Sequence, residues 1–193
     1  FTRVVHEQGV SVVGVDISKE LIARAQEKSA NISYIVAPAH ETTLPKQSFD
    51  AVYTILAFEN IKHVDQTMAE VARVLKPTGR FLLVLLHPAF RIPQYSDWKF
   101  DSAKDLQYRR VDKYLSEISI TIAQSPFKGK KSITTTTYHR SLQWYMKVFK
   151  KHGFGISGME EWISHKKSQS GPRQHAEDIA RKEFPMFLAL ELR

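Results

Sequence analysis

The stretch VVGVDISKELIARAQEKSA, residues 12–30, joins an apolar run to a helical pattern at a single acid, Asp16. The run up to Val15 is continuously apolar, which is typical of a strand buried on both faces of a parallel sheet. Ser18 stands where a helix N-cap is preferred, and we expect the helix to continue to about Ala30. A strand that ends on a carboxylate and leads directly into a helix predicts a unit of an α/β fold.

The alternation of strand and helix continues to residue 88. A short helix is expected before Gly9, strands at 32–37, 49–56 and 80–88, and a helix at 64–75 that ends in KPTG, a Pro and Gly stop signal. Strands that alternate with single helices predict a Rossmann-like, doubly wound α/β sheet. We expect it to be mostly parallel, with an antiparallel edge strand near the C-terminus.

The pattern changes at residue 89. Residues 89–115 are rich in aromatic side chains and irregular, so no regular element is predicted there. The segments 117–124 and 131–139 have β-branched alternation and flank SPFKGK, which predicts a hairpin. An amphipathic helix is expected at 141–153, strands at 154–163 and 185–192, and at 164–183 a polar loop, with room for a helical turn. We expect one domain, made of residues 1–88, an insertion at 89–140 and a C-terminal part at 141–193.

Charge is unevenly distributed along the chain. Residues 1–88 have no net charge, whereas residues 89–193 carry the entire surplus of +8. A surplus of positive charge attracts anionic partners. The same surplus is also explained by a solvated, lysine-rich surface without a partner. No nucleic-acid-binding motif is visible, and no apolar run approaches the ~20 residues of a membrane helix. The lack of cysteine suits a reducing compartment, so a cytoplasmic location is expected.

Asp16 has two interpretations from its local sequence. In doubly wound sheets, ligands bind beyond the carboxyl ends of the strands, and an acid there accepts hydrogen bonds from a ribose diol. The same carboxylate can instead cap the following helix or interact with its dipole. The local sequence does not decide between them.

The downstream sequence resembles a known family. Residues 37–84 read APAHETTLPKQSFDAVYTILAFENIKHVDQTMAEVARVLKPTGRFLLV. With LP at 44–45, SFD at 48–50 and RVLKPTG at 73–79, the motifs have the order and spacing of class I S-adenosylmethionine-dependent methyltransferases of the small-molecule branch. The resemblance covers residues 1–88, and residues 138–161 are similar to the last helix and strand of that family.

The resemblance implies S-adenosyl-L-methionine as cofactor and assigns its contacts. Asp16 would bind the ribose hydroxyls and Ile17 would cover adenine, with Pro38, Ala39 and His40 at the adenine edge and Ile55 and Leu56 near the methionine part. Pro38 departs from the pattern, because the family often has an aspartate there that accepts from the adenine amino group. His40 or the backbone would have to replace it.

The resemblance also implies a small-molecule acceptor, of anionic or aromatic character. His87, Tyr138 and His139 are the candidate catalytic residues for a general base, although each is also explained as a structural polar residue. No residue cluster has metal-ligand spacing, so no metal is expected. Aromatic residues of the insertion are candidates for the acceptor pocket, and they equally suit a satellite core: Phe90, Tyr95, Trp98, Phe100 and Tyr108. Four arginines are candidates for binding an acidic acceptor, and they equally suit a solvated surface: Arg91, Arg109, Arg110 and Arg140.

The glycine-rich turn of such folds begins about 20 residues before the acid, which places it upstream of Phe1. We therefore expect a preceding strand and glycine loop in the natural protein; the alternative is that another segment of the chain fills that place. Two other functions stay open. Asp16 suits an NAD-dependent oxidoreductase equally well, and Pro38 also fits a non-catalytic relative. Oligomeric state is left open.

Overall fold

The computed structural model describes residues 1–124 and 133–193. The helices and strands of these residues are, in chain order, α1 (Thr2–Glu7), β1 (Val13–Asp16), α2 (Lys19–Lys28), β2 (Ser33–Val36), β3 (Phe49–Ile55), the 3-10 turn η1 (Phe58–Asn60), α3 (Val64–Val74), β4 (Leu75–Leu86), β5 (Ser96–Asp101), β6 (Leu106–Val111), β7 (Ile118–Gln124), β8 (Ile133–His139), α4 (Leu142–Lys151), β9 (Ile156–Trp162), α5 (Gln174–Glu183) and β10 (Phe187–Leu192). The α/β alternation predicted for residues 1–88 is confirmed.

The first strands form a small parallel sheet. β1 pairs with β2 in register from Val13 opposite Ser33 to Asp16 opposite Val36. The Ser18 hydroxyl accepts a hydrogen bond from the Leu21 amide at 3.2 Å, so it caps α2 as predicted. Asp16 therefore lies at the carboxyl end of β1, directly before the start of α2.

A second sheet has four strands in the order β3–β4–β10–β9. β3 and β4 are parallel, while β10 runs antiparallel to both of its neighbours, β4 and β9. The antiparallel strand was expected at the edge but lies inside the sheet, because β9 pairs along its far side. Within the described residues, β1 pairs only with β2 and β3 only with β4, so the two sheets share no strand pairing.

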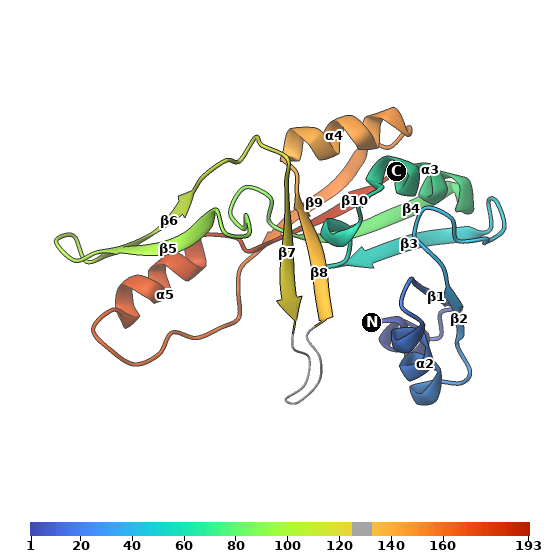
Figure 1. The fold of residues 1–193 in the computed structure, drawn as a ribbon, viewed down its shortest axis with the longest axis horizontal. Coiled ribbons are helices and arrows are strands. Elements are labelled where there is room, and N and C mark those ends of the chain that lie inside the picture. The colour runs from blue at the N-terminus through green and yellow to red at the C-terminus, as the bar shows by residue number, and fades with distance from the viewer. Residues whose placement is uncertain (125–132) are drawn as a thin grey trace.

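The core lies between the four-stranded sheet and the helices α3 and α4, which lie on one face of it (Figure 1). Phe58 is fully buried there, with its ring centroid 5.8 Å from that of Phe81 and 6.1 Å from that of Tyr145. Met68 of α3, Phe149 of α4 and Leu188 of β10 complete the same cluster. This core fixes η1, which directly follows β3.

The insertion is more regular than its sequence predicts. β5 and β6 form an antiparallel hairpin within residues 89–115, and α5 replaces most of the loop expected at 164–183. The two predicted arms of the second hairpin, β7 and β8, pair antiparallel, and their connection lies outside the described residues. Both hairpins extend away from the main sheet (Figure 1). Among residues 1–124 and 133–193, no helix has the length and apolarity needed to cross a membrane.

Candidate functional site

The Asp16 carboxylate uses one oxygen in a local hydrogen bond, and its other oxygen is available to a ligand. Its Oδ1 accepts a hydrogen bond from the backbone amide of Ser18 at 2.8 Å, which is an Asx turn at the start of α2. Its Oδ2 has no partner within the described residues, and the side chain is half-buried. Ile17 is 73% exposed beside it. The two interpretations of Asp16 are thus compatible, because capping uses only one oxygen.

The residues expected at the adenine edge lie next to Asp16. The Ala37 amide donates to the Asp16 carbonyl at 3.0 Å, and the Pro38 carbonyl accepts from the Glu41 amide in a turn at 38–41. Pro38, Ala39 and His40 are half-buried in this turn. The His40 ring lies 5.1 Å from that of His63, just before α3. The turn therefore connects β1 to the segment that follows β3.

The end of β3 has an unusual backbone conformation. Leu56 has a φ of 52°, a left-handed value that costs a branched side chain free energy. Its amide donates to the Val84 carbonyl at 2.9 Å, which holds this conformation, and its side chain is 39% exposed. Ile55 next to it is half-buried. Such positions often occur at functional sites, and this one lies where the methionine part was expected.

A small cavity of about 20 Å³ opens beyond the carboxyl ends of β3 and β4. Segments far apart in the sequence converge on it: η1, the end of β4 and the chain after it, the end of β8, and α4. Its lining residues are Glu59, Leu86, Pro88, Arg91, Pro93, Thr137, Tyr138, His139, Arg140 and Tyr145. The structure therefore brings together two of the three predicted catalytic candidates, Tyr138 and His139.

His139 is buried and oriented by a backbone carbonyl. Its Nε2 donates to the Tyr114 carbonyl at 2.8 Å, since a carbonyl can only accept. Burial lowers the pKa of His139, and the Tyr114 carbonyl opposes that shift. The neutral ring with its proton on Nε2 leaves Nδ1 as a proton acceptor.

His87 is placed differently. It is 1% exposed and does not line the cavity. Its Nδ1 accepts from the Ala89 amide at 3.2 Å, and its Nε2 lies 2.8 Å from Oε1 of Glu161. Both ring nitrogens are already bonded, so His87 joins β4 to β9 and is not free to act as the base. The catalytic role of His87 stays a prediction, and these two hydrogen bonds favour the structural role.

Two titratable cavity residues were not singled out from the sequence, Glu59 and Tyr145. Burial raises the pKa of the Glu59 carboxyl, against backbone amides and the charge of Arg91. Burial also raises the pKa of Tyr145 to about 12, with the Arg140 guanidinium opposing. The signal for Glu59 was an acid three residues beyond a strand end, which is where ligands bind in such sheets. Tyr145 has no comparable signal within its helix.

The aromatic residues of the insertion form a satellite core. Phe184, which follows α5, makes edge-on ring contacts with Phe90 and Trp98 at 5.6 and 5.5 Å. The Arg173 guanidinium lies 4.7 Å from the centre of the Phe100 ring. Of the four predicted anion-binding arginines, Arg91 and Arg140 line the cavity, whereas Arg109 stacks on Trp98 and Arg110 pairs with Asp112. Within the part of the chain that the structure describes, no cluster of three or more His, Asp or Glu residues could hold a metal.

Comparisons with known proteins find methyltransferases. Residues 1–83 match the family model described as "Methyltransferase domain". The mitochondrial 2-methoxy-6-polyprenyl-1,4-benzoquinol methylase of Bos taurus is 42% identical over 81 residues, which are 38% of this chain and 24% of that protein. The ubiquinone/menaquinone biosynthesis C-methyltransferase UbiE of Pseudomonas paraeruginosa is 32% identical over 90 residues, 44% of this chain and 35% of that protein. The chain thus covers between a quarter and about a third of these curated relatives.

A solved structure extends the likeness to almost the whole chain. The crystal structure of an S-adenosylmethionine dependent methyltransferase from Mesorhizobium loti has a TM-score of 0.76 and 28% sequence identity. The similarity covers 99% of this chain and 84% of that one.

Proposed function

We propose that this chain, which has the fold of the class I S-adenosylmethionine-dependent methyltransferases and matches their methyltransferase domain over residues 1–83, transfers a methyl group to a small-molecule acceptor. The single observation that carries the proposal is the free Oδ2 of Asp16 at the carboxyl end of β1, beside the turn at 38–41. A carboxylate in that position accepts hydrogen bonds from ribose hydroxyls.

The residues present fit S-adenosylmethionine. Asp16 would take the ribose, exposed Ile17 would cover one adenine face, and the backbone of the turn at 38–41 would serve the adenine edge. Pro38 cannot accept a hydrogen bond through a side chain, so His40 or the backbone would accept instead. Leu56, at its left-handed position, would contact the methionine part. When bound, the cofactor supplies an activated methyl group on a sulfonium.

The acceptor is proposed to bind at the cavity beyond β3 and β4. The curated relatives are named as methylases of a benzoquinol and of quinone biosynthesis, which suggests a hydroxylated aromatic acceptor here as well. His139, with Nδ1 available, is the proposed general base, and Tyr138 flanks it. Since positioning can supply most of the rate in methyl transfer, this base matters only for a weakly acidic acceptor.

Calorimetric titration of the full-length protein with S-adenosylmethionine and with NAD tests the proposal. We expect binding of S-adenosylmethionine and none of NAD. Binding of NAD alone would instead indicate an oxidoreductase, and binding of neither would indicate a relative that has kept the fold without the cofactor.

A further inference from the structure

Two buried polar atoms line the cavity beyond β3 and β4 without a protein partner. They are Oε2 of Glu59, in a residue 7% exposed, and Nη1 of Arg140, in a residue 5% exposed. Neither has a hydrogen bond to any residue that the structure describes. Buried polar groups in native proteins are almost always paired, and leaving charged ones unpaired is costly. Two such atoms in one cavity indicate a group that binds between them.

The Arg140 guanidinium is held rigidly. Its Nη2 donates to the Ile61 carbonyl at 3.0 Å and to the Lys62 carbonyl at 3.1 Å. Its Cζ lies 4.9 Å from the centres of both the Tyr138 and the Trp144 rings. With one amino group anchored and the plane fixed by aromatic rings, Nη1 is a pre-organised donor.

Glu59 is positioned by the core. It belongs to η1, whose Phe58 is fully buried, and it comes three residues after Leu56. Burial raises the pKa of Tyr145, the charge of Arg140 and a hydrogen bond to it oppose that shift, and the Glu59 charge adds to it. The Tyr145 hydroxyl therefore lies beside Arg140, and the three side chains converge. Oε2 is therefore a fixed acceptor close to the strand end where the methionine part of the cofactor is proposed to bind.

The size and polarity of the cavity limit its occupant. A volume of about 20 Å³ holds one water-sized group. That group must donate to a carboxylate and accept from a guanidinium, and a hydroxyl does both. The apolar part of the wall consists of Leu86, Pro88 and Pro93, and the other lining residues are Arg91, Thr137, Tyr138, His139 and Tyr145.

We infer that Glu59 and Arg140 bind one hydroxyl group of the methyl acceptor, so that the acceptor belongs to the phenols or enols. This inference rests on the proposed function and makes it more specific. The hydroxyl donates to Oε2 of Glu59 and accepts from Nη1 of Arg140, and the attached ring, which is too large for the cavity, lies at its opening. The pair orients the acceptor toward the methyl donor.

Phenol and toluene are suitable probes because they have nearly the same shape and differ in one hydroxyl. Their binding to the full-length protein is measured by NMR titration for the wild type and for Glu59→Gln, which keeps the side-chain shape. Glu117→Gln, at an exposed glutamate of the insertion, is the matched control. We expect phenol to bind at least about tenfold more tightly than toluene in the wild type and in Glu117→Gln. In Glu59→Gln the preference should largely disappear.

Equal binding of the two probes, or an undiminished preference in Glu59→Gln, would overturn the inference. A crystal structure of the wild type soaked with phenol gives an independent result: the phenol oxygen is expected within hydrogen-bond distance of both Oε2 and Nη1. Water alone in the cavity, with phenol absent or bound elsewhere, would also refute it. A parallel titration with S-adenosylhomocysteine separates the two proposals, since lack of nucleoside binding contradicts the methyltransferase function whatever phenol does.

Discussion

Asp16 is the residue on which the proposed cofactor site depends. Because Oδ1 already accepts from the Ser18 amide, the orientation of the carboxylate is set before any ligand arrives. A pre-oriented acceptor loses little entropy on binding, which is why a capping role supports a ribose-binding role instead of competing with it.

Asp16→Asn should weaken S-adenosylmethionine binding by about tenfold or more, because a charge-assisted hydrogen bond to the ribose is lost. Thermal stability should change little, since an asparagine still accepts from the Ser18 amide. Calorimetry measures the affinity and scanning calorimetry the midpoint. Asp105→Asn, at an exposed left-handed position in the insertion, is the control. Unchanged affinity in Asp16→Asn would remove Asp16 from the site.

Gly79 is required by close packing at the start of β4. A Cβ atom at this position would lie 2.9 Å from Cδ2 of Leu75 and 3.0 Å from the Lys76 carbonyl oxygen. Since the backbone oxygen cannot easily move, Gly79→Ala should destabilise the protein by about 1–3 kcal/mol. Gly171→Ala, where nothing lies within 4 Å, is the control and should be close to neutral. Chemical denaturation compares the two; equal stability would contradict the packing argument.

At the level of single residues, the sequence predicted Asp16 and two cavity residues, Tyr138 and His139. An acid at a strand end has a recognisable position, and Tyr138 and His139 end a predicted strand. Glu59 and Tyr145 could not be predicted from the sequence as cavity residues, because the cavity is formed by four segments that are far apart in the chain. The structural partner of His87 was hidden for the same reason, because Glu161 is 74 residues away in the sequence.

At the level of elements, the repeating α/β half was predictable, as were the two arms of the β7–β8 hairpin in the insertion, whereas the β5–β6 hairpin was not. Buried parallel strands have continuous apolar runs, and α3 has a clear apolar face. By contrast, α5 was expected as a polar loop, because only Ala176 and Ala180 of the helix are buried and alanine is a weak apolar signal. In β5, Asp97 and Lys99 alternate with Trp98 and Phe100 as in a strand, but the element has only six residues and lies in an otherwise irregular stretch.

The packing of α5 against the β5–β6 hairpin gives a prediction at this scale. Phe184 contacts both Phe90 and Trp98, so Phe184→Ala should loosen the hairpin and α5 together while the four-stranded sheet stays protected. Hydrogen exchange should accelerate in residues 96–111 and 174–183 and stay unchanged in β3 and β4. Tyr108→Ala, at a 44% exposed position of β6, is the control. Uniform acceleration throughout the chain would show that no separate unit exists.

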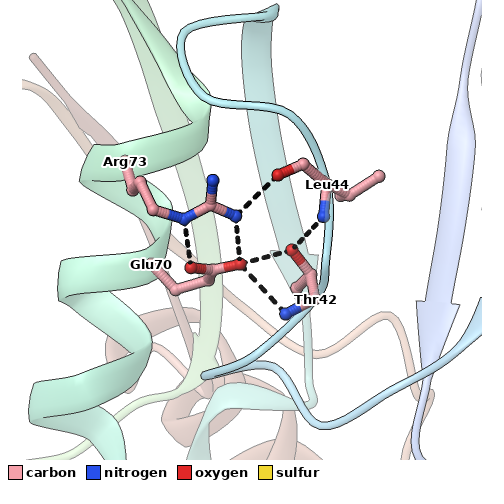
Figure 2. A network of polar contacts seen from close by, with 4 residues as sticks. All are labelled: Thr42, Leu44, Glu70 and Arg73. Atoms are coloured by element: carbon pink, nitrogen blue, oxygen red, sulfur yellow. Dashed lines mark hydrogen bonds and ion pairs between the residues drawn. The ribbon is translucent and has the colours of Figure 1, made fainter.

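At the level of the whole molecule, the two sheets share no strand pairing among residues 1–124 and 133–193, and side chains of α3 hold the loop that runs from one sheet to the other. Figure 2 shows Glu70 of α3 between Arg73 and the loop that connects β2 to β3. Nε of Arg73 donates to Oε2 of Glu70 at 2.7 Å, and the Thr42 amide donates to Oε1 at 2.9 Å. Arg73 also donates to the Leu44 carbonyl at 2.7 Å. This network fixes the loop that carries the proposed adenine edge.

The network predicts a dependence of stability on pH. The Arg73 hydrogen bond lowers the pKa of Glu70 from 4.5 to about 2, although burial opposes the shift. A lowered pKa in the folded state stabilises the protein fully above pH 4.5, and this contribution is lost as the pH falls towards 2. Because Arg73 is partly exposed, we expect Glu70 to contribute about 1–3 kcal/mol at neutral pH.

Glu70→Gln should therefore lower the free energy of unfolding by about this amount at pH 7, and the difference from wild type should shrink between pH 4.5 and pH 2. Urea denaturation across that range measures it. Asp50→Asn, which breaks an exposed pair with Lys76, is the control and should have little effect. Since Glu70 holds residues 42–44 in place, the same variant should also bind S-adenosylmethionine more weakly. A difference that does not vary with pH would mean that the network joins the two sheets through its shape and not through the Glu70 charge.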